Sequence, residues 1–323
     1  MPARLGVVLS TVTDAPLASL VDLGKLAETH GYEAVLVNEG RGDALAVCQA
    51  IALATQRITV GTNIANIYFR HPFLAAATAR TIAELSEGRL LLGLGMSHRS
   101  LLAKLGIDMG NARERLGEYT AYVRAALAGK VGEGFLVPPP SPYRIPVHVA
   151  GNTAESAAVA GALGDGLMPF LSPRAYLPTL LEAAHAARAE SALAGEPFEC
   201  CLSFPTFLSE DEDAARAAAR YNLAFFAQLP NYRRQWRRAG FGTAMDALKA
   251  AWDIGNRRSA ALQVPDELVE EVCVFGNVAQ CRARIERFRE AGVDLPVLAV
   301  SPVNEDRVTA TQRALALLAP QSD

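Results

Sequence analysis

Residues 58–94 read ITVGTNIANIYFRHPFLAAATARTIAELSEGRLLLGL and contain two apolar runs on either side of a longer helical pattern. The runs, 58–62 and 90–94, are mostly apolar and do not alternate with polar residues. Strands of this kind are covered on both faces, as in a parallel sheet. Between them, Pro72 suits the first turn of a helix and Gly88 suits its end. The stretch therefore predicts a strand–helix–strand unit with parallel strands.

The same alternation extends in both directions from this unit. Further apolar runs lie at 5–9, 34–37, 146–150, 166–170, 200–207 and 295–300, and helical patterns separate most of them. Eight strands alternating with helices predict an α/β protein, a closed TIM (β/α)8 barrel, better than they predict an open doubly wound sheet. The open sheet is the competing interpretation. Against it, no GxGxxG follows the first strand, and Gly93-Leu94-Gly95 lacks the third glycine.

The long stretch between the last two predicted strands looks almost entirely helical. We expect one domain, 1–323, with a helical insertion at about 210–290, after the seventh strand. Aromatic residues of this stretch supply either a pocket wall or core and dimer contacts: Tyr221, Phe225, Phe226, Tyr232 and Trp236.

Composition narrows the class of protein. Of 323 residues half are hydrophobic, and 31 basic residues stand against 34 acidic ones. This balance disfavours nucleic-acid and anionic-membrane surfaces, and no apolar run is long enough to span a bilayer. We therefore expect a cytoplasmic protein that acts on a small molecule. Five cysteines without CxxC spacing and five histidines without HExxH spacing disfavour a disulfide framework and a metal site.

In a barrel, the residues that follow each strand gather at one end, where sites are built. Here polar residues and glycines follow strands two to five: Glu39; Asn63 and Ile64; Gly95, Ser97 and His98; and the run from Ala150 to Ser156. The turn Gly151-Asn152-Thr153 joins a strand to a helix N-terminus, which with the Thr153 and Ser156 hydroxyls would hold a phosphate or would serve as an ordinary N-cap.

His98 and Glu39 are the titratable candidates at these strand ends. His98 is either a general acid, since the ordinary pKa of histidine is near neutrality, or a hydrogen-bonded loop residue. Glu39 either lines the pocket or serves as a capping or salt-bridge group.

Several segments, taken together, resemble the bacterial luciferase-like monooxygenase superfamily. Residues 58–72 resemble its third-strand segment, and residues 81–95, 145–150 with 164–166, and 274–276 with 291–294 resemble later segments in the same order. The turn at 93–97 is similar to that of the coenzyme F-420-dependent reductases. The resemblance implies a TIM barrel with an insertion after strand seven, often dimeric, with a flavin or the deazaflavin F-420 at the C-terminal end.

Position by position, the resemblance implies that Asn63-Ile64 is a non-proline cis peptide that supports the cofactor ring. Glu39 stands where the family has an acidic residue near the ring. Gly40 replaces a histidine that is often found next and is catalytic in some members. His98 falls near an acidic residue that serves some members as proton donor, and it would take over that task.

Gly151, Asn152 and Thr153 match the family's phosphate-binding turn, which favours phosphate over a simple cap. The resemblance implies an oxidoreductase that transfers hydride, in either direction, between F-420 and a small organic substrate with a C=C, C=N or C=O bond. The implied catalytic residues are His98 and Glu39. The implied cofactor-binding residues are Glu39, Asn63, Ile64, Gly95, Ser97, Ala150, Gly151, Asn152, Thr153 and Ser156.

Two other functions stay open. One is an FMN-dependent monooxygenase that uses O₂. The other is a flavin- or deazaflavin-binding barrel without turnover, as the glycine at position 40 indicates. We expect the protein to be a homodimer.

Overall fold

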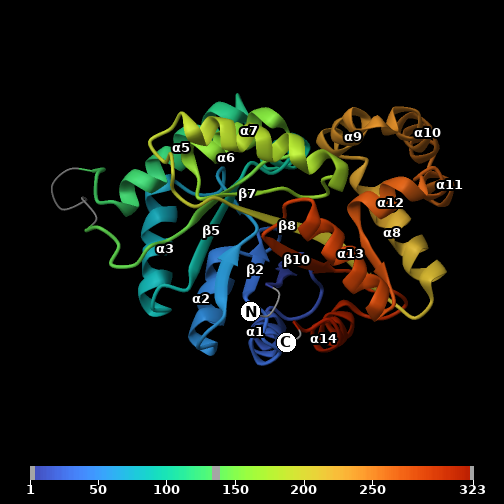
Figure 1. Cartoon of the computed structure of the whole chain (residues 1–323), viewed down its shortest axis with the longest axis horizontal. Coiled ribbons are helices and arrows are strands. Elements are labelled where there is room, and N and C mark those ends of the chain that lie inside the picture. The colour runs from blue at the N-terminus through green and yellow to red at the C-terminus, as the bar shows by residue number, and fades with distance from the viewer. Residues whose placement is uncertain (1–3, 133–138, 321–323) are drawn as a thin grey trace.

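A computed structural model describes residues 4–132 and 139–320 of the chain (Figure 1). The strands are β1 Gly6–Ser10, β2 Ala34–Asn38, β3 Thr59–Thr62, β4 Ala65–Asn66, β5 Leu90–Gly95, β6 Val147–Ala150, β7 Gly166–Met168, β8 Glu199–Leu208, β9 Val274–Gly276 and β10 Leu295–Val300. The α-helices are α1 Ala18–Thr29, α2 Ala44–Ala54, α3 Pro72–Leu85, α4 Arg99–Lys104, α5 Ala112–Leu127, α6 Ala154–Leu163, α7 Leu177–Ala189, α8 Glu212–Phe226, α9 Pro230–Trp236, α10 Gly242–Asp253, α11 Arg257–Leu262, α12 Asp266–Val272, α13 Val278–Glu290 and α14 Arg307–Leu317. Shorter turns are the 3-10 turn η2, Arg174–Tyr176, and the π-helical turn η3, Arg237–Phe241.

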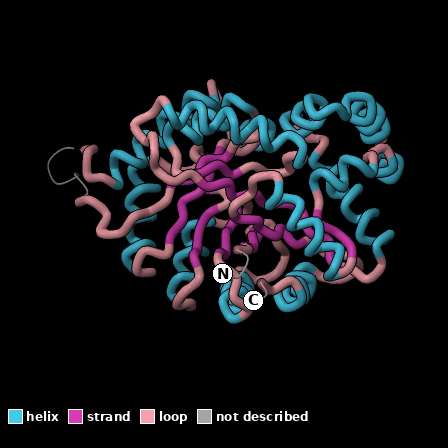
Figure 2. Tube along the Cα trace, in the orientation of Figure 1, coloured by secondary structure: helices cyan, strands magenta, loops and turns pink. Residues whose placement is uncertain are grey.

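The strands close into a parallel barrel in the order β1, β2, β3, β5, β6, β7, β8 and β10. Closure is carried by β10, which pairs with β1 on one side and with β8 on the other. The open-sheet interpretation is therefore wrong, and the predicted (β/α)8 barrel is confirmed. Helices surround the strands, as the tube drawing in Figure 2 shows.

Two hydrophobic cores hold the barrel, because successive strand residues face opposite sides. Leu92 and Val149 belong to the larger core between strands and helices, whereas Leu36, Leu91 and Met168 belong to a smaller core. At Gly93 a Cβ atom would lie 2.1 Å from the backbone oxygen of Thr62. Neighbouring strands approach so closely there that only glycine fits.

The third barrel strand is bulged, a feature that the sequence pattern did not indicate. Its first half, β3, pairs Gly61 with Leu91 of β5, whereas its second half, β4, pairs Ala65 with Leu94. Four residues of the third strand thus stand against three of β5, which defines a β-bulge. The Asn63–Ile64 peptide bond inside the bulge is cis, as the family resemblance implies.

The segment at about 210–290 holds helices and one short strand that was not predicted. Helices α8 to α12 form a separate hydrophobic cluster around Trp236, Met245 and Leu268. Strand β9 then pairs with the end of β8, from Thr206 to Leu208. Helix α13 packs beside β10 and β8, so it belongs to the barrel wall rather than to the helical cluster.

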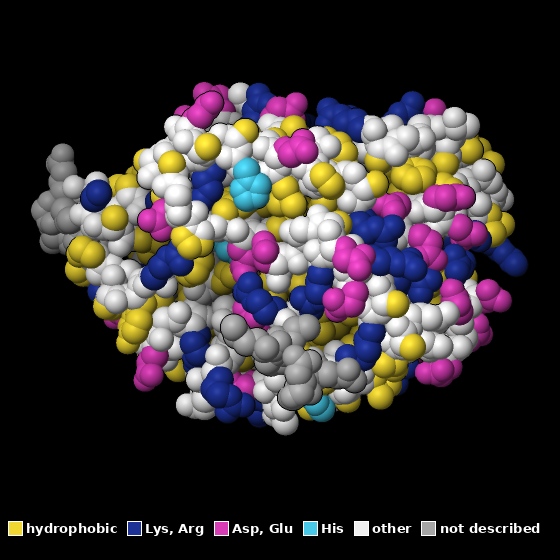
Figure 3. Space-filling model, in the orientation of Figure 1, with side chains coloured by type: hydrophobic (Ala, Val, Ile, Leu, Met, Phe, Trp, Pro, Cys, Tyr) yellow, Lys and Arg dark blue, Asp and Glu magenta, His cyan; other side chains and the backbone are white. Residues whose placement is uncertain are grey.

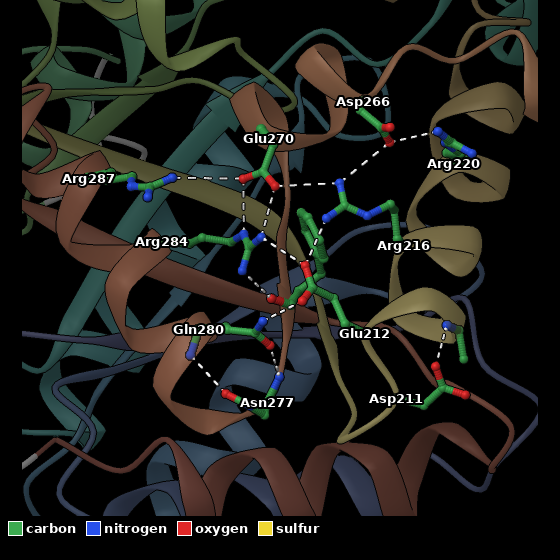
Figure 4. Close-up of polar contacts among 12 residues, drawn as sticks. Asp211, Glu212, Arg216, Arg220, Asp266, Glu270, Asn277, Gln280, Arg284 and Arg287 are labelled. Carbon is green, nitrogen blue, oxygen red and sulfur yellow. Dashed lines mark hydrogen bonds and ion pairs between the residues drawn. The ribbon is translucent and has the colours of Figure 1, made fainter.

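A charged network ties the helical cluster to the barrel wall (Figure 4). Two guanidinium groups lie over the Phe275 ring of β9, with Arg284 at 3.7 Å and Arg216 at 4.7 Å from its centroid. Glu270 of α12 pairs with both arginines, at 2.8 Å from Arg284 and 3.5 Å from Arg216. The network fixes α8 and α12 relative to α13, because each of its charges has an opposite partner.

No helix within the described ranges is both long enough and apolar enough to cross a membrane. The five cysteines are free thiols, and all of them are buried.

Candidate active site

The C-terminal ends of the barrel strands expose residues that the strand pattern would otherwise bury. Val8 in mid-β1 and Ser10 at its end are each partly exposed between two buried neighbours, and Asn38 at the end of β2 is also partly exposed. Ala150 at the end of β6 and Ala299 in β10 are also partly exposed. Alternate residues of a barrel strand face its inside. The partly exposed set therefore marks the inner mouth of the barrel.

Three of the predicted cofactor-binding residues come together at this mouth. A Cβ atom on Gly95 would lie 2.5 Å from Cγ1 of Ile64 and 3.1 Å from Cβ of Ala150. The bulge of the third strand therefore brings Ile64 against the end of β5 and near the end of β6. Gly95 and Ala150 are small and Ile64 is apolar, so together they form a candidate floor for a flat ring.

Asn63, the other residue of the cis peptide, reaches across to β8. Its Nδ2 atom donates to Oγ of Ser203 at 3.2 Å. Ser203 is buried in the middle of β8, where the apolar run gave no sign of a polar contact. This contact ties the bulge to the other side of the barrel.

Glu39 lies beside the bulge in a buried ion pair. Its side chain is 3% exposed, and its Oε1 atom pairs with Nη2 of Arg70. Its Oε2 atom accepts from the backbone N–H of Asn66 at 2.6 Å. Arg70 was not among the predicted site residues, because a lone arginine in a loop gives no indication of its partner.

His98 contacts the helical insertion. Its Nδ1 atom lies 3.1 Å from Oδ1 of Asn231 in α9, and its ring meets the Tyr232 ring edge-on at 5.4 Å. Because an amide oxygen only accepts, Nδ1 carries a proton, and Nε2 is the nitrogen left for a substrate. Burial lowers the pKa of His98 below its ordinary value, although the Asn231 contact raises it in part. The role of His98 as a proton donor stays a prediction.

Ser97, the residue before His98, has a positive φ of 59°. This left-handed conformation is uncommon outside glycine, and here it turns the chain sharply after β5. The turn carries His98 away from the strand and toward α9.

The predicted phosphate turn is an N-cap in this structure. The Thr153 hydroxyl accepts from the N–H of Ser156, and the Ser156 hydroxyl accepts from the N–H of Thr153 at 3.0 Å. The Asn152 side chain is also engaged, since it exchanges two hydrogen bonds of 2.9 Å with the backbone of Phe170. Gly151 packs tightly, with a Cβ position only 3.0 Å from the backbone of Ser156.

The start of α6 nevertheless keeps features that suit an anion. Among the described residues, the N–H group of Ala154 has no acceptor. The pKa of Glu155 is lowered, first by the Thr153 hydroxyl and its own N–H, and then by Arg238 and Arg113. The dipole of a helix N-terminus itself favours negative charge, and the Glu155 carboxylate already lies in this first turn.

The five insertion aromatics lie in three kinds of place. Phe226 and Tyr232 pack edge-on against Phe170, at centroid distances of 5.5 and 5.9 Å. Tyr221 and Phe225 are instead exposed on α8, and Trp236 is completely buried. Phe226 and Tyr232 are therefore the insertion aromatics that adjoin Phe170, and Tyr232 also contacts His98.

These features define a (β/α)8-barrel protein with its candidate site at the C-terminal strand ends. A family model described as luciferase-like monooxygenase matches residues 2–295, and the chain belongs to this family.

Individual proteins of known sequence share only part of their residues with this chain. The chain is 28% identical to a putative coenzyme F-420-dependent oxidoreductase of Mycobacterium tuberculosis, over 94% of this chain and 97% of the relative. It is 26% identical to a 5,10-methylenetetrahydromethanopterin reductase of Archaeoglobus fulgidus, over 89% of this chain and 91% of the relative. Among solved structures, the F-420-dependent tetrahydromethanopterin reductase of Methanopyrus kandleri has a TM-score of 0.77 at 20% identity, and 98% of each chain is covered.

A second solved structure has another cofactor. It is a type II Baeyer–Villiger monooxygenase of Pseudomonas putida in complex with FMN, with a TM-score of 0.66 at 17% identity, covering 99% of this chain and 97% of that one. At this identity the likeness concerns the fold.

Proposed function

We propose that this chain is an oxidoreductase that transfers hydride between coenzyme F-420 and a small organic substrate with a C=C, C=N or C=O bond. The observation that carries the proposal is the floor of Ile64, Gly95 and Ala150 at the barrel mouth. The F-420-linked relatives support the deazaflavin as the cofactor.

The residues at the mouth fit such a cofactor. Ile64, Gly95 and Ala150 are apolar and suit a planar ring, and the start of α6 offers the N–H of Ala154 and the positive end of the helix dipole for an anionic tail. When bound, F-420 supplies or accepts the hydride at its ring carbon. The protein supplies orientation and the matching proton.

His98 would hold that proton at Nε2. In the neutral form it accepts a proton while a substrate loses hydride, and in the protonated form it donates one while a substrate gains hydride. Because the same group serves both directions, the proposal covers oxidation and reduction of the substrate alike.

Fluorescence titration of the purified protein with F-420 and with FMN tests the proposal. We expect micromolar binding of F-420 and at least about tenfold weaker binding of FMN. Binding of FMN alone would contradict the proposal and would favour an FMN-dependent monooxygenase. Binding of neither would favour a barrel without turnover.

A further inference from the structure

We propose that Glu39 and Arg70 act as one unit that positions the bulged segment 63–66, and that Glu39 is a positioning residue rather than a proton donor. The inference rests on the proposed function only for what the bulge supports. The ion pair and its effect on the segment are properties of the chain itself.

Both carboxylate oxygens of Glu39 have a partner. Oε1 pairs with Arg70, and Oε2 accepts from the Asn66 N–H at 2.6 Å. The side chain is 3% exposed, and that of Arg70 is 10% exposed. A proton donor at this position would have to break a buried ion pair in each turnover, at a large cost in free energy.

The Glu39 carboxylate accepts a backbone hydrogen bond that a longer β2 strand would otherwise accept. The N–H of Asn63 still donates to Val37 of β2 at 2.8 Å, but β2 ends at Asn38. Three residues further on, the N–H of Asn66 donates to Glu39, while the next one, of Ile67, donates to Gly95 of β5 at 3.0 Å. Glu39 thus continues the hydrogen bonding of β2 beyond its last residue, on the side of β4 that faces away from β5.

Arg70 makes the arrangement cooperative. Its Nη2 atom also lies 3.2 Å from Asp43, whose carboxylate accepts from the N–H of Leu45 at the start of α2. Its Nη1 atom is buried and has no partner among the described residues. With one of its two carboxylates half-exposed, Arg70 depends on Glu39 for compensation of its buried charge. Loss of the Glu39 charge should therefore destabilise the position of Arg70 as well.

The test uses Glu39→Gln, the double variant Glu39→Gln/Arg70→Met, and Glu84→Gln as matched control, since Glu84 pairs with Arg80 on the surface of α3. Hydrogen–deuterium exchange of peptides covering 63–67 needs no cofactor. We expect Glu39→Gln to speed this exchange at least about tenfold because Arg70 loses its counter-ion. The double variant should regain most of the protection, since no charge is left buried and the introduced amide oxygen still accepts from Asn66. The control should match wild type.

Cofactor affinity and pH profile separate positioning from proton donation. We expect Glu39→Gln to weaken F-420 binding at least about tenfold, to keep the shape of the pH profile, and to be rescued in affinity by the double variant. Unchanged exchange and affinity, with a kcat about a hundredfold lower and a lost limb of the pH profile in both variants, would overturn the proposal. If wild type does not bind F-420, the proposed function fails, but the exchange experiment still decides on the pair. If Glu39→Gln does not fold, failure of the double variant to fold would also count against the pair.

Discussion

At the scale of single residues, the chemistry of the mouth depends on the imidazole of His98. Its Nδ1 proton is held by Asn231, its ring packs on Tyr232, and burial lowers its pKa. The glycine at position 40 has no side chain to share this task, and Glu39 is bound to Arg70. His98 is therefore the group that we expect to move the substrate proton.

Replacement of His98 by glutamine keeps part of the hydrogen bonding to Asn231 but removes the titrating group. We expect kcat to fall at least about a hundredfold with little change in F-420 affinity, since positioned acid–base catalysis contributes about 10²–10⁴-fold. The measurement is steady-state turnover beside a cofactor titration, with His30→Gln at the end of α1 as control. Turnover within about threefold of wild type would make His98 a structural residue, with the proton supplied by water.

The rates of substrate oxidation and of substrate reduction should change with pH in opposite directions. Because the pKa of His98 is lowered, oxidation of substrate, which needs the neutral ring, should rise with pH through a midpoint below the ordinary value of about 6.5. Reduction, which needs the protonated ring, should fall through the same midpoint. Asn231→Ala removes a contact that raises this pKa, so the midpoint should move down, whereas Asn231→Asp should move it up because a carboxylate stabilises the imidazolium. A midpoint that stays in place in both variants would contradict the contact.

At the scale of secondary-structure elements, the start of α6 is a cap that also suits an anion. Gly151→Asp is a poor test of anion binding, because its Cβ would press on Ser156 at 3.0 Å. Ala154→Asp is better, since an acidic residue in the first turn stabilises a helix while it repels a bound phosphate.

We expect Ala154→Asp to keep or raise the melting temperature and to weaken F-420 binding about tenfold, which corresponds to about 1.4 kcal/mol. Ala186→Asp on the exposed surface of α7 is the matched control, and it should leave the affinity unchanged. Equal affinities in the two variants would mean that the start of α6 does not contact the anionic tail.

The elements themselves were predictable in kind but not in their irregularities. Apolar runs such as 34–37 and 90–94 indicated the barrel strands, because a strand covered on both faces has to be apolar throughout. The predicted sixth strand, 166–170, ends at Met168, and Phe170 forms only an isolated bridge to Ser203. Strand β9 was missed, since three residues between two helices form no recognisable period.

The candidate site was predictable only where a residue acts through its position in the strand order. Gly95 and Ala150 follow from strand ends, and the cis peptide follows from the family resemblance. Arg70, Ser203 and Asn231 could not be predicted, because their partners lie far along the chain and depend on the folded arrangement. Side-chain pairing across such distances leaves no periodic trace in a sequence.

At the scale of the whole molecule, one barrel carries the candidate site and one helical cluster packs against the barrel. The face drawn in Figure 3 intersperses basic and acidic side chains rather than collecting either sign. The long strand β8 joins the two parts, since it pairs with β10 along Cys201 to Thr206 and with β9 beyond. The charged network around Phe275 fixes the helical cluster, and with it Asn231, beside the mouth.

The central claim is that F-420 lies on the floor of Ile64, Gly95 and Ala150. Fluorescence titration of wild type and of Ala150→Leu with F-420 tests it most directly, because Ala150 is partly exposed at the mouth and a larger side chain there would occupy the place of the ring. We predict micromolar binding by wild type and at least about a hundredfold weaker binding by Ala150→Leu, at a melting temperature close to that of wild type. Equal binding by a folded Ala150→Leu protein, or binding of FMN in place of F-420 by wild type, would contradict the account.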